Sequence, residues 1–177
     1  MKLVVLDRDG TINHDSDEYI KSPEEWRPIR GSPEAIARLT HAGWRVVVAT
    51  NQSGLARGLF DIATLNAIHD TMHRTIAQAG GRIDAIFFCP HAPEAGCGCR
   101  KPKPGLLHEI AARMNVDLAD VPVVGDSQRD LQAAAAAGAQ PCLVLTGNGK
   151  KAREAGGLPL RTRVYADLAA VAAQLAP

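Results

Sequence analysis

The sequence is poor in aromatic residues, in net charge and in long apolar runs, and each shortage excludes a class of protein. Only seven of the 177 residues are aromatic (three Phe, two Trp and two Tyr), too few for a platform on which nucleic-acid bases stack. The 20 basic residues are balanced by 19 acidic ones, so no overall field attracts nucleic acid or an anionic membrane. No apolar run approaches the ~18 residues of a membrane span, and the apolar run near residue 1 is too short for a signal peptide. We therefore expect a cytoplasmic protein without nucleic-acid or membrane partners.

A chain of 177 residues that is 46% hydrophobic and 22% charged has the length and composition of one globular domain. Short apolar runs rich in β-branched residues alternate with helical patterns along it. Strands are expected at Leu3–Leu6, Arg45–Ala49, Ile83–Phe88, Val121–Val124, Pro141–Leu145 and Arg163–Tyr165. The glycine-rich stretch Thr146–Lys151 is expected to be a turn. This alternation predicts an α/β fold with a mainly parallel sheet, whose ligands bind beyond the carboxyl ends of the strands.

The first expected strand ends in two carboxylates, Asp7 and Asp9, within the run Asp-Arg-Asp-Gly-Thr. Two carboxylates so spaced can point into one crevice, where an ionised Asp can act as a nucleophile without a base. The second carboxylate can protonate a leaving group and then activate water. Repulsion between carboxylates and a phosphate dianion calls for a hard cation such as Mg²⁺. The alternative is a solvated Asp-Gly turn.

Two more strand ends carry polar side chains suited to holding a phosphate and a metal ion. The second strand ends in neutral side chains that can hold phosphate oxygens: Thr50, Asn51, Gln52 and Ser53. The fourth ends in Gly125 and Asp126, with Asp130 shortly after, so one carboxylate can complete a metal site while the other orders the loop. For both segments the alternative is a helix-capping turn.

A basic segment, Cys99-Arg100-Lys101-Pro102-Lys103, precedes the fourth expected strand. A lysine beside a phosphate stabilises the charge that develops during transfer, and an arginine suits a second anionic group on the substrate. Either Lys101 or Lys103 can fill the first role. The alternatives are a solvated basic run or an RNA-contacting patch, and the near-zero net charge opposes the latter.

The four cysteines divide into a cluster of three and one isolated residue. The cluster, Cys89-Pro-His91 followed by Cys97-Gly-Cys99, offers three thiolates and one imidazole, the ligand set of a closed structural zinc site. A disulfide is the alternative, but a Cys-x-Cys pair bridges itself poorly and cytoplasmic thiols stay reduced. We therefore predict Zn²⁺ in residues 89–99, hereafter the zinc loop, and a buried packing role for Cys142.

Together these segments resemble the four motifs of the haloacid dehalogenase-like phosphatases over residues 1 to about 150. The resemblance implies a Rossmann-like, doubly wound sheet without a large cap domain, in one domain spanning 1–177 with the zinc loop as an insert. It implies that Asp7 is a nucleophile that becomes an aspartyl-phosphate and that Asp9 is the general acid/base. Thr50 and a lysine then steady the phosphoryl group, and Mg²⁺ is held by Asp7, Asp9 (through its backbone carbonyl) and Asp126.

The zinc loop before Arg100 and Lys101 resembles one branch of that superfamily, which includes heptose-bisphosphate and histidinol-phosphate phosphatases. The match is better to the heptose enzymes, which implies removal of the 7-phosphate of a heptose 1,7-bisphosphate in lipopolysaccharide biosynthesis, with histidinol phosphate as the alternative substrate. It favours Lys101 over Lys103 for the phosphoryl group. The substrate contacts it implies, together with those from the second strand end, are Asp15, Tyr19, Asn51, Gln52, Ser53, Arg100 and Lys103.

Two hypotheses of other kinds remain at this point. A non-catalytic, zinc-containing binding module on the same scaffold is opposed by the presence of every motif residue, and a DNA 3′-phosphatase by the charge and sparse aromatics.

His69 and His73 lie one helical turn apart beside an apolar stripe, and we expect them to serve helix packing and the surface rather than a metal. We expect a monomer whose only partner is a small sugar phosphate.

Overall fold

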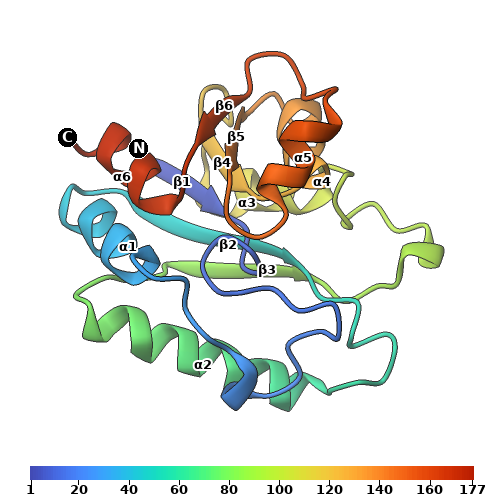
Figure 1. The fold of residues 1–177 in the computed structure, drawn as a ribbon. Coiled ribbons are helices and arrows are strands. Elements are labelled where there is room, and N and C mark those ends of the chain that lie inside the picture. The colour runs from blue at the N-terminus through green and yellow to red at the C-terminus, as the bar shows by residue number, and fades with distance from the viewer.

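A computed structural model describes residues 1–177 (Figure 1). Six strands form one sheet in the order β3-β2-β1-β4-β5-β6, and every neighbouring pair is parallel. The strands are β1 (Leu3–Leu6), β2 (Arg45–Asn51), β3 (Ala85–Cys89), β4 (Pro122–Gly125), β5 (Gln140–Val144) and β6 (Arg163–Tyr165). The predicted α/β fold with a doubly wound parallel sheet is confirmed.

Helices cover both faces of this sheet (Figure 1). They are α1 (Ser32–His41), α2 (Ile62–Gln78), α3 (Gly105–Met114), α4 (Gln128–Ala136), α5 (Gly149–Ala155) and α6 (Leu168–Leu175), with short 3₁₀ helices at Pro23–Glu25 and Pro93–Ala95. Side chains alternate across β1, so Val4 and Leu6 pack with α1, α2 and α6, whereas Leu3 and Val5 pack with α3 and α4. No helix has both the length and the apolar character needed to cross a membrane.

The loops that follow β1, β2 and β3 gather at one edge of the sheet, on the right in Figure 1. The chain order reverses between β1 and β4, which lie side by side in the middle of the sheet. A doubly wound sheet opens a crevice at such a switch point, beyond the carboxyl ends of the strands. The fold therefore brings the segments after β1, β2 and β4 to one place.

The strand ends lie within two residues of those expected, and one predicted turn differs. The predicted turn at Thr146–Lys151 is wrong in part, because α5 begins at Gly149 and continues through good helix formers to Ala155. Glycine is required at this helix start, since a Cβ on Gly149 would overlap the carbonyl of Val144. Asp61 caps α2, because its side chain accepts a hydrogen bond from the Thr64 amide at 2.8 Å. Cys142 is buried in the core, as predicted.

Candidate active site

A cleft at the carboxyl edge of the sheet is lined almost entirely by polar residues. It collects twelve of the residues singled out in the sequence, from the ends of β1, β2 and β4, the start of α4, the basic segment and the loop after β1: Asp7, Asp9, Asp15, Tyr19, Thr50, Asn51, Gln52, Ser53, Arg100, Lys101, Asp126 and Asp130. Lys103 does not line this cleft, because its Nζ donates to the carbonyl of Cys97 at 3.0 Å. The structure thus brings Lys101, not Lys103, beside Asp7.

The Asp126 carboxylate sits in a niche that only glycine can form. A Cβ on Gly10 or on Gly147 would overlap this carboxylate, and both glycines have positive φ angles, of +81° and +52°. Asp126 Oδ2 also accepts a hydrogen bond from the Asn148 amide at 2.8 Å. The end of β4 is therefore packed tightly against the loops that follow β1 and β5.

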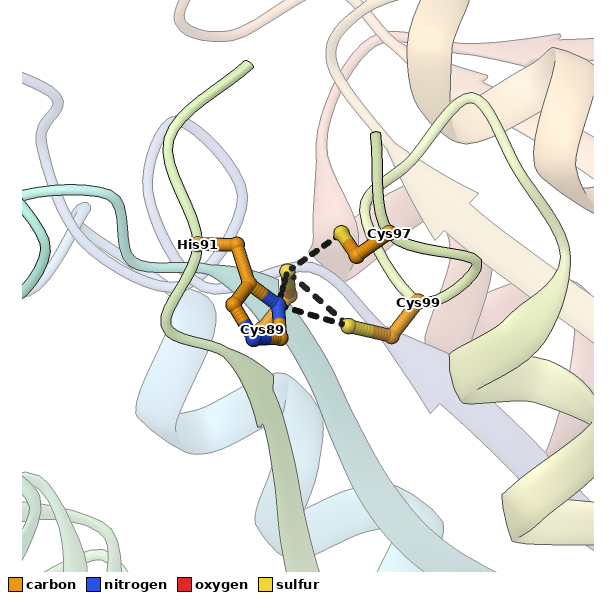
Figure 2. Close-up of side chains that lie close together, drawn as sticks. All are labelled: Cys89, His91, Cys97 and Cys99. Carbon is orange, nitrogen blue, oxygen red and sulfur yellow. Dashed lines mark hydrogen bonds between the residues drawn. The ribbon is translucent and has the colours of Figure 1, made fainter. Parts of the chain in front are cut away.

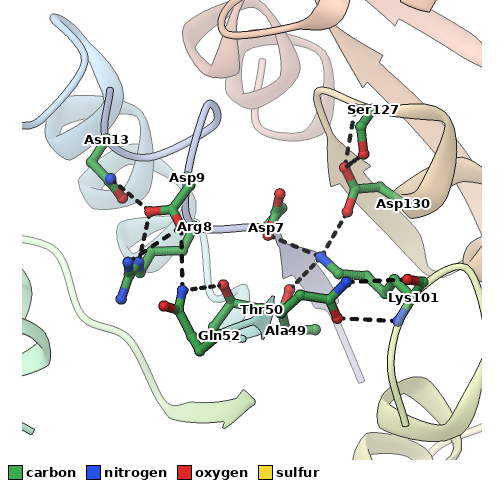
Figure 3. Close-up of polar contacts among 11 residues, drawn as sticks. Asp7, Arg8, Asp9, Asn13, Ala49, Thr50, Gln52, Lys101, Ser127 and Asp130 are labelled. Atoms are coloured by element: carbon green, nitrogen blue, oxygen red, sulfur yellow. Dashed lines mark hydrogen bonds and ion pairs between the residues drawn. The ribbon is translucent and has the colours of Figure 1, made fainter. Parts of the chain in front are cut away.

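Lys101 is the centre of a buried charge cluster (Figure 3). Its Nζ donates to Asp7 Oδ1 at 2.9 Å, to Asp130 Oδ1 at 2.6 Å and to the carbonyl of Ala49 at 2.8 Å. All three ammonium protons are thereby used. Burial alone would lower the pKa of Lys101, but the neighbouring Asp130 and Asp7 carboxylates outweigh it and raise that pKa, so the lysine stays charged.

The cluster holds more negative charge than this one lysine can balance. The carboxylate oxygens of Asp7, Asp126 and Asp130 lie within 4.8 Å of one another. Burial, with repulsion from Asp130 and Asp126, raises the pKa of Asp7 well above its ordinary value, and burial with repulsion from Asp130 raises the pKa of Asp126 to about 7. Closely spaced hard oxygen ligands with this excess of charge fit a divalent cation such as Mg²⁺.

Asp130 differs from the other two carboxylates because both of its oxygens already have partners. One accepts from Lys101, and Oδ2 accepts from the Ser127 amide at 3.1 Å and the Ser127 hydroxyl at 2.8 Å, which closes the first turn of α4 (Figure 3). A Cβ on Gly125 would overlap this carboxyl group. Asp130 is thus placed to order the loop and to hold Lys101.

Asp9 lies on the other side of Asp7 and is held by three side chains (Figure 3). Oδ1 accepts from Arg8 Nε and from Asn13 Nδ2, both at 2.9 Å, and Oδ2 accepts from Arg8 Nη2 and from Gln52 Nε2, both at 3.2 Å. Burial raises the pKa of Asp9, but the Arg8 charge and the hydrogen bonds from Asn13, Arg8 and Gln52 outweigh it, so the pKa lies below its ordinary value. Asp9 is therefore ionised and fixed in orientation.

The polar end of β2 serves the site in two ways. The Asn51 side chain donates to the carbonyl of Lys101 and accepts from its amide, both at 3.1 Å, so it fixes the backbone of that lysine. Thr50 Oγ1 accepts from Gln52 Nε2 at 2.9 Å, which leaves its own proton free to be donated. Asn51 is thus engaged with the protein, while Thr50 keeps a donor available.

The cleft also contains residues that the sequence reasoning missed. Arg129 and Asn148 both line it, and Asn148 Nδ2 donates to Asp15 Oδ2 at 3.3 Å. Neither Arg100 nor Arg129 forms an ion pair within the chain. Asn148 follows β5, whose carboxyl end meets the same edge of the sheet, and that position was the signal that could have found it.

The cysteine cluster has the geometry of a metal site (Figure 2). Its three sulfur atoms and His91 Nδ1 all lie within 4.8 Å of one another, with Cys89 Sγ at 3.7 Å from Cys97 Sγ and 3.1 Å from Cys99 Sγ. Both separations exceed a disulfide bond of about 2.05 Å, and the longer one is close to the ~3.8 Å between sulfur atoms around a tetrahedral zinc ion. All four cysteines are free. The arrangement fits the predicted zinc site and not the alternative disulfide.

Comparisons with known proteins agree with this geometry. Residues 98–171 match a family model described as HAD-hydrolase-like. The chain is 67% identical over 99% of its length to the D-glycero-beta-D-manno-heptose-1,7-bisphosphate 7-phosphatase of Bordetella bronchiseptica, and covers 98% of that protein. It is 55% identical over 99% of its length to the 7-phosphatase of the same name from Pseudomonas putida, and covers 99% of it.

Solved structures give the same result. The crystal structure of D,D-heptose 1,7-bisphosphate phosphatase from B. bronchiseptica complexed with magnesium and phosphate superposes with a TM-score of 0.98, at 67% identity over 99% of this chain and 98% of that one. The phosphatase of the same name from Burkholderia thailandensis gives 0.80, at 58% identity over 98% and 97%. The fold and the acidic cleft define a haloacid dehalogenase-like hydrolase. Within that superfamily the chain belongs to the family of these heptose-bisphosphate phosphatases.

The raised carboxyl pKa values predict that Mg²⁺ binding weakens as the pH falls. Because its pKa is about 7, the Asp126 carboxyl is largely protonated below pH 7 and largely ionised at pH 8. Mg²⁺ must therefore displace a proton from Asp126 at the lower pH but not at pH 8. With a pKa of about 7, the apparent Kd for Mg²⁺ should be about tenfold higher at pH 6 than at pH 8. Calorimetric titration at the two pH values measures this, with Asp126→Asn as the control that should lose the part of the dependence that comes from Asp126. A Kd for Mg²⁺ that does not change with pH would contradict the raised pKa values of the carboxylate cluster.

Proposed function

We propose that the protein removes the 7-phosphate of D-glycero-β-D-manno-heptose 1,7-bisphosphate, releasing inorganic phosphate and the heptose 1-phosphate. The observation that carries this is the Asp7 carboxylate, bonded to Lys101 Nζ at 2.9 Å in a cleft shared with Asp9 and Asp126, in a chain 67% identical to a phosphatase of that name. The β anomer follows from the names of the relatives.

Asp7, Asp126 and the backbone carbonyl of Asp9 are proposed to hold Mg²⁺. The support is the spacing of the carboxylates of Asp7 and Asp126, and the magnesium and phosphate bound by the B. bronchiseptica phosphatase. When bound, the ion neutralises the repulsion between the Asp7 carboxylate and the phosphate dianion. The excess negative charge of the cleft is thereby removed.

The chemical step needs two groups on opposite sides of the phosphorus. The Asp7 carboxylate attacks phosphorus, the bond from phosphorus to the C7 oxygen breaks, and an aspartyl-phosphate forms. For this step Asp9 must bind a proton, which the negative charge of the bound phosphate favours, and it gives that proton to the departing C7 oxygen. Asp9 then takes a proton from the water that attacks phosphorus, and cleavage of the acyl-phosphate bond restores Asp7.

The remaining polar groups hold the phosphoryl oxygens as charge develops on them. The Lys101 ammonium stays beside Asp7, and Thr50 lines the same cleft with a hydroxyl proton that is free to be donated. We assign Asn51 the role of holding the backbone of Lys101, since both the nitrogen and the oxygen of its side-chain amide are used there. Gln52 holds Asp9, and Ser53 offers a further donor in the cleft.

The 1-phosphate is proposed to lie against Arg100, with Asp15 and Tyr19 contacting the sugar from the loop after β1. Arg100 has no acidic partner in the chain, so its charge is available to an anion. Arg129 lines the same cleft. The pKa of Arg100 is lowered mainly by burial and next by the charge of Arg129, so the two cations lie near one another. Lys103 lies outside the cleft and is left with the zinc loop.

Zn²⁺ is proposed to hold the zinc loop through Cys89, His91, Cys97 and Cys99. The role is structural, because all four ligand positions are filled by the protein and Lys101 follows the last ligand by two residues. A single domain over residues 1–177, a monomeric state, a cytoplasmic location and the lack of nucleic-acid and membrane partners stay predictions.

Loss of one zinc ligand should loosen the segment that positions Lys101. We expect Cys99→Ala to lose the metal, to lower Tm by about 5 °C or more, and to lower kcat. Cys142→Ala removes a cysteine from the core but should retain one zinc ion per chain. Metal analysis of purified protein and scanning calorimetry measure both. A Cys99→Ala protein with unchanged metal content would contradict the assignment.

Parallel assays on three phosphates test the proposed substrate. We expect kcat/KM for the heptose 1,7-bisphosphate to exceed that for the heptose 7-phosphate and for histidinol phosphate by at least about a hundredfold, because only the bisphosphate pairs with Arg100. Arg100→Gln should narrow this gap. Equal or higher kcat/KM on histidinol phosphate would overturn the substrate, and no phosphate release from any of them in the presence of Mg²⁺ would favour a binding module.

A further inference from the structure

One buried histidine outside the cleft contacts the group that holds Asp9. His69 lies on the inner face of α2, is 7% exposed, and its Nε2 lies 3.1 Å from Arg8 Nη1. The two residues are 61 positions apart in the chain. We infer that His69 is a positioning residue that acts through Arg8 to fix the orientation of Asp9 for proton transfer. This inference rests on the proposed role of Asp9 as general acid/base.

Arg8 is a rigid link between these two residues. Its side chain is fully buried, with 0% exposure, and Asp9 is the only carboxylate that pairs with it. Nε and Nη2 donate to the two Asp9 oxygens at 2.9 and 3.2 Å, and Nη1 is directed to His69. The planar guanidinium therefore has one edge on Asp9 and its far end on α2, and it cannot rotate without losing both contacts.

The chemistry of the contact fixes the state of the histidine. A guanidinium has donors but no acceptor, so Arg8 donates and His69 Nε2 accepts, which places the imidazole proton on Nδ1. Burial and the Arg8 charge lower the pKa of His69 to about 3. His69 is thus a neutral acceptor beside the buried Arg8, which a protonated histidine would repel.

The consequence for catalysis is specific to the proton-transfer role. Arg8 supplies a hydrogen bond to each Asp9 oxygen, whereas Asn13 and Gln52 supply one each. Without the acceptor on α2, the buried Nη1 group has no partner, and Arg8 gains by turning toward another acceptor. Asp9 then loses its fixed orientation, while Asp7, Lys101 and Asp126 keep their contacts. If His69 served only to pack α2 against the sheet, its loss would not disturb Asp9 more than Asp7, Lys101 or Asp126.

Leaving-group dependence separates the two roles. The single-turnover rate of leaving-group release is measured, with enzyme in excess and Mg²⁺ present, for the heptose bisphosphate and for 4-nitrophenyl phosphate. The sugar alkoxide needs a proton to leave and 4-nitrophenolate does not. We expect His69→Leu to lower the rate with the sugar phosphate by about ten- to a hundredfold, which is part of the ~10²–10⁴ that general acid–base catalysis supplies, and to leave 4-nitrophenol release within about threefold.

Three variants complete this design. His69→Gln keeps an acceptor oxygen near the position of Nε2 and should restore most of the rate. His73→Leu, one turn along on the exposed side of α2, should behave as wild type with both substrates. Asp9→Asn should show the same selectivity as His69→Leu with a larger loss.

The outcomes distinguish the inference from its premise. If Asp9→Asn is selective and His69→Leu lowers both rates equally or neither, the positioning role is overturned while the function of Asp9 stands. If Asp9→Asn itself lacks selectivity, the acid role of Asp9 fails and the inference fails with it. Should His69→Leu not fold, ¹⁵N spectra of the wild-type imidazole decide: an unprotonated Nε2 and a protonated Nδ1 between pH 5 and 8 support the contact, and a protonated Nε2 overturns it.

Discussion

Asp7→Asn should abolish phosphate release from the heptose bisphosphate, lowering kcat by at least about 10⁴, because an amide cannot form the acyl-phosphate. The variant should fold as the wild type does. Burial and the neighbouring carboxylates raise the pKa of Asp7, which means that the ionised form is disfavoured in the folded protein. Without Mg²⁺, Tm should therefore be equal to that of the wild type or higher.

The control for this variant is Asp120→Asn, at an exposed residue paired only with Arg161 on the surface. It should leave kcat unchanged and Tm within a few degrees. Both proteins are compared by phosphate release and by calorimetry, with and without Mg²⁺. Turnover by Asp7→Asn above a hundredth of the wild-type rate would remove Asp7 from the role of nucleophile.

Lys101→Met should cost both activity and stability. The ammonium is the only cation that contacts Asp7 and Asp130, so its loss leaves both carboxylates without a positive charge beside them. Breaking a buried ion pair on one side costs about 3–5 kcal/mol of unfolding free energy. Loss of a charge that stabilises the transferred phosphoryl group lowers kcat by about 10²–10³.

Lys103→Met is the matched control, since it makes the same change two residues away. Lys103 donates only to the carbonyl of Cys97 on the exposed zinc loop, so the variant should keep kcat within about threefold. Steady-state kinetics and denaturant titration of the two variants provide the comparison. A larger loss of kcat in Lys103→Met than in Lys101→Met would reverse the assignment of the two lysines.

Much of this architecture could be predicted from the sequence because its signals are local. The buried strands β1, β2 and β4 are short apolar runs, and parallel strands bring their carboxyl ends to one edge. The carboxylates at the ends of β1 and β4 were therefore expected to meet, and they do. The Cys-x-His and Cys-x-Cys pairs likewise predict their own cluster, since all four residues lie in one loop.

The contacts that could not be predicted depend on tertiary packing between distant residues. His69 was expected only to pack, because helical periodicity shows that it borders the buried face of α2 and not that Arg8 faces it. Asn51 was expected to bind substrate, yet its side chain is paired with the backbone of Lys101. Arg129 and Asn148 were missed because one lies inside a helical pattern and the other in a glycine-rich run.

The central claim is that phosphate leaves in two displacements through Asp7. The stereochemistry at phosphorus tests it most directly, since it does not depend on whether the intermediate accumulates. A heptose 1-phosphate 7-phosphorothioate, made chiral at phosphorus with oxygen-18, is hydrolysed in water labelled with oxygen-17, and the configuration of the product thiophosphate is determined. Two in-line displacements predict overall retention. Inversion would mean that water attacks the substrate directly, and would contradict the aspartyl-phosphate.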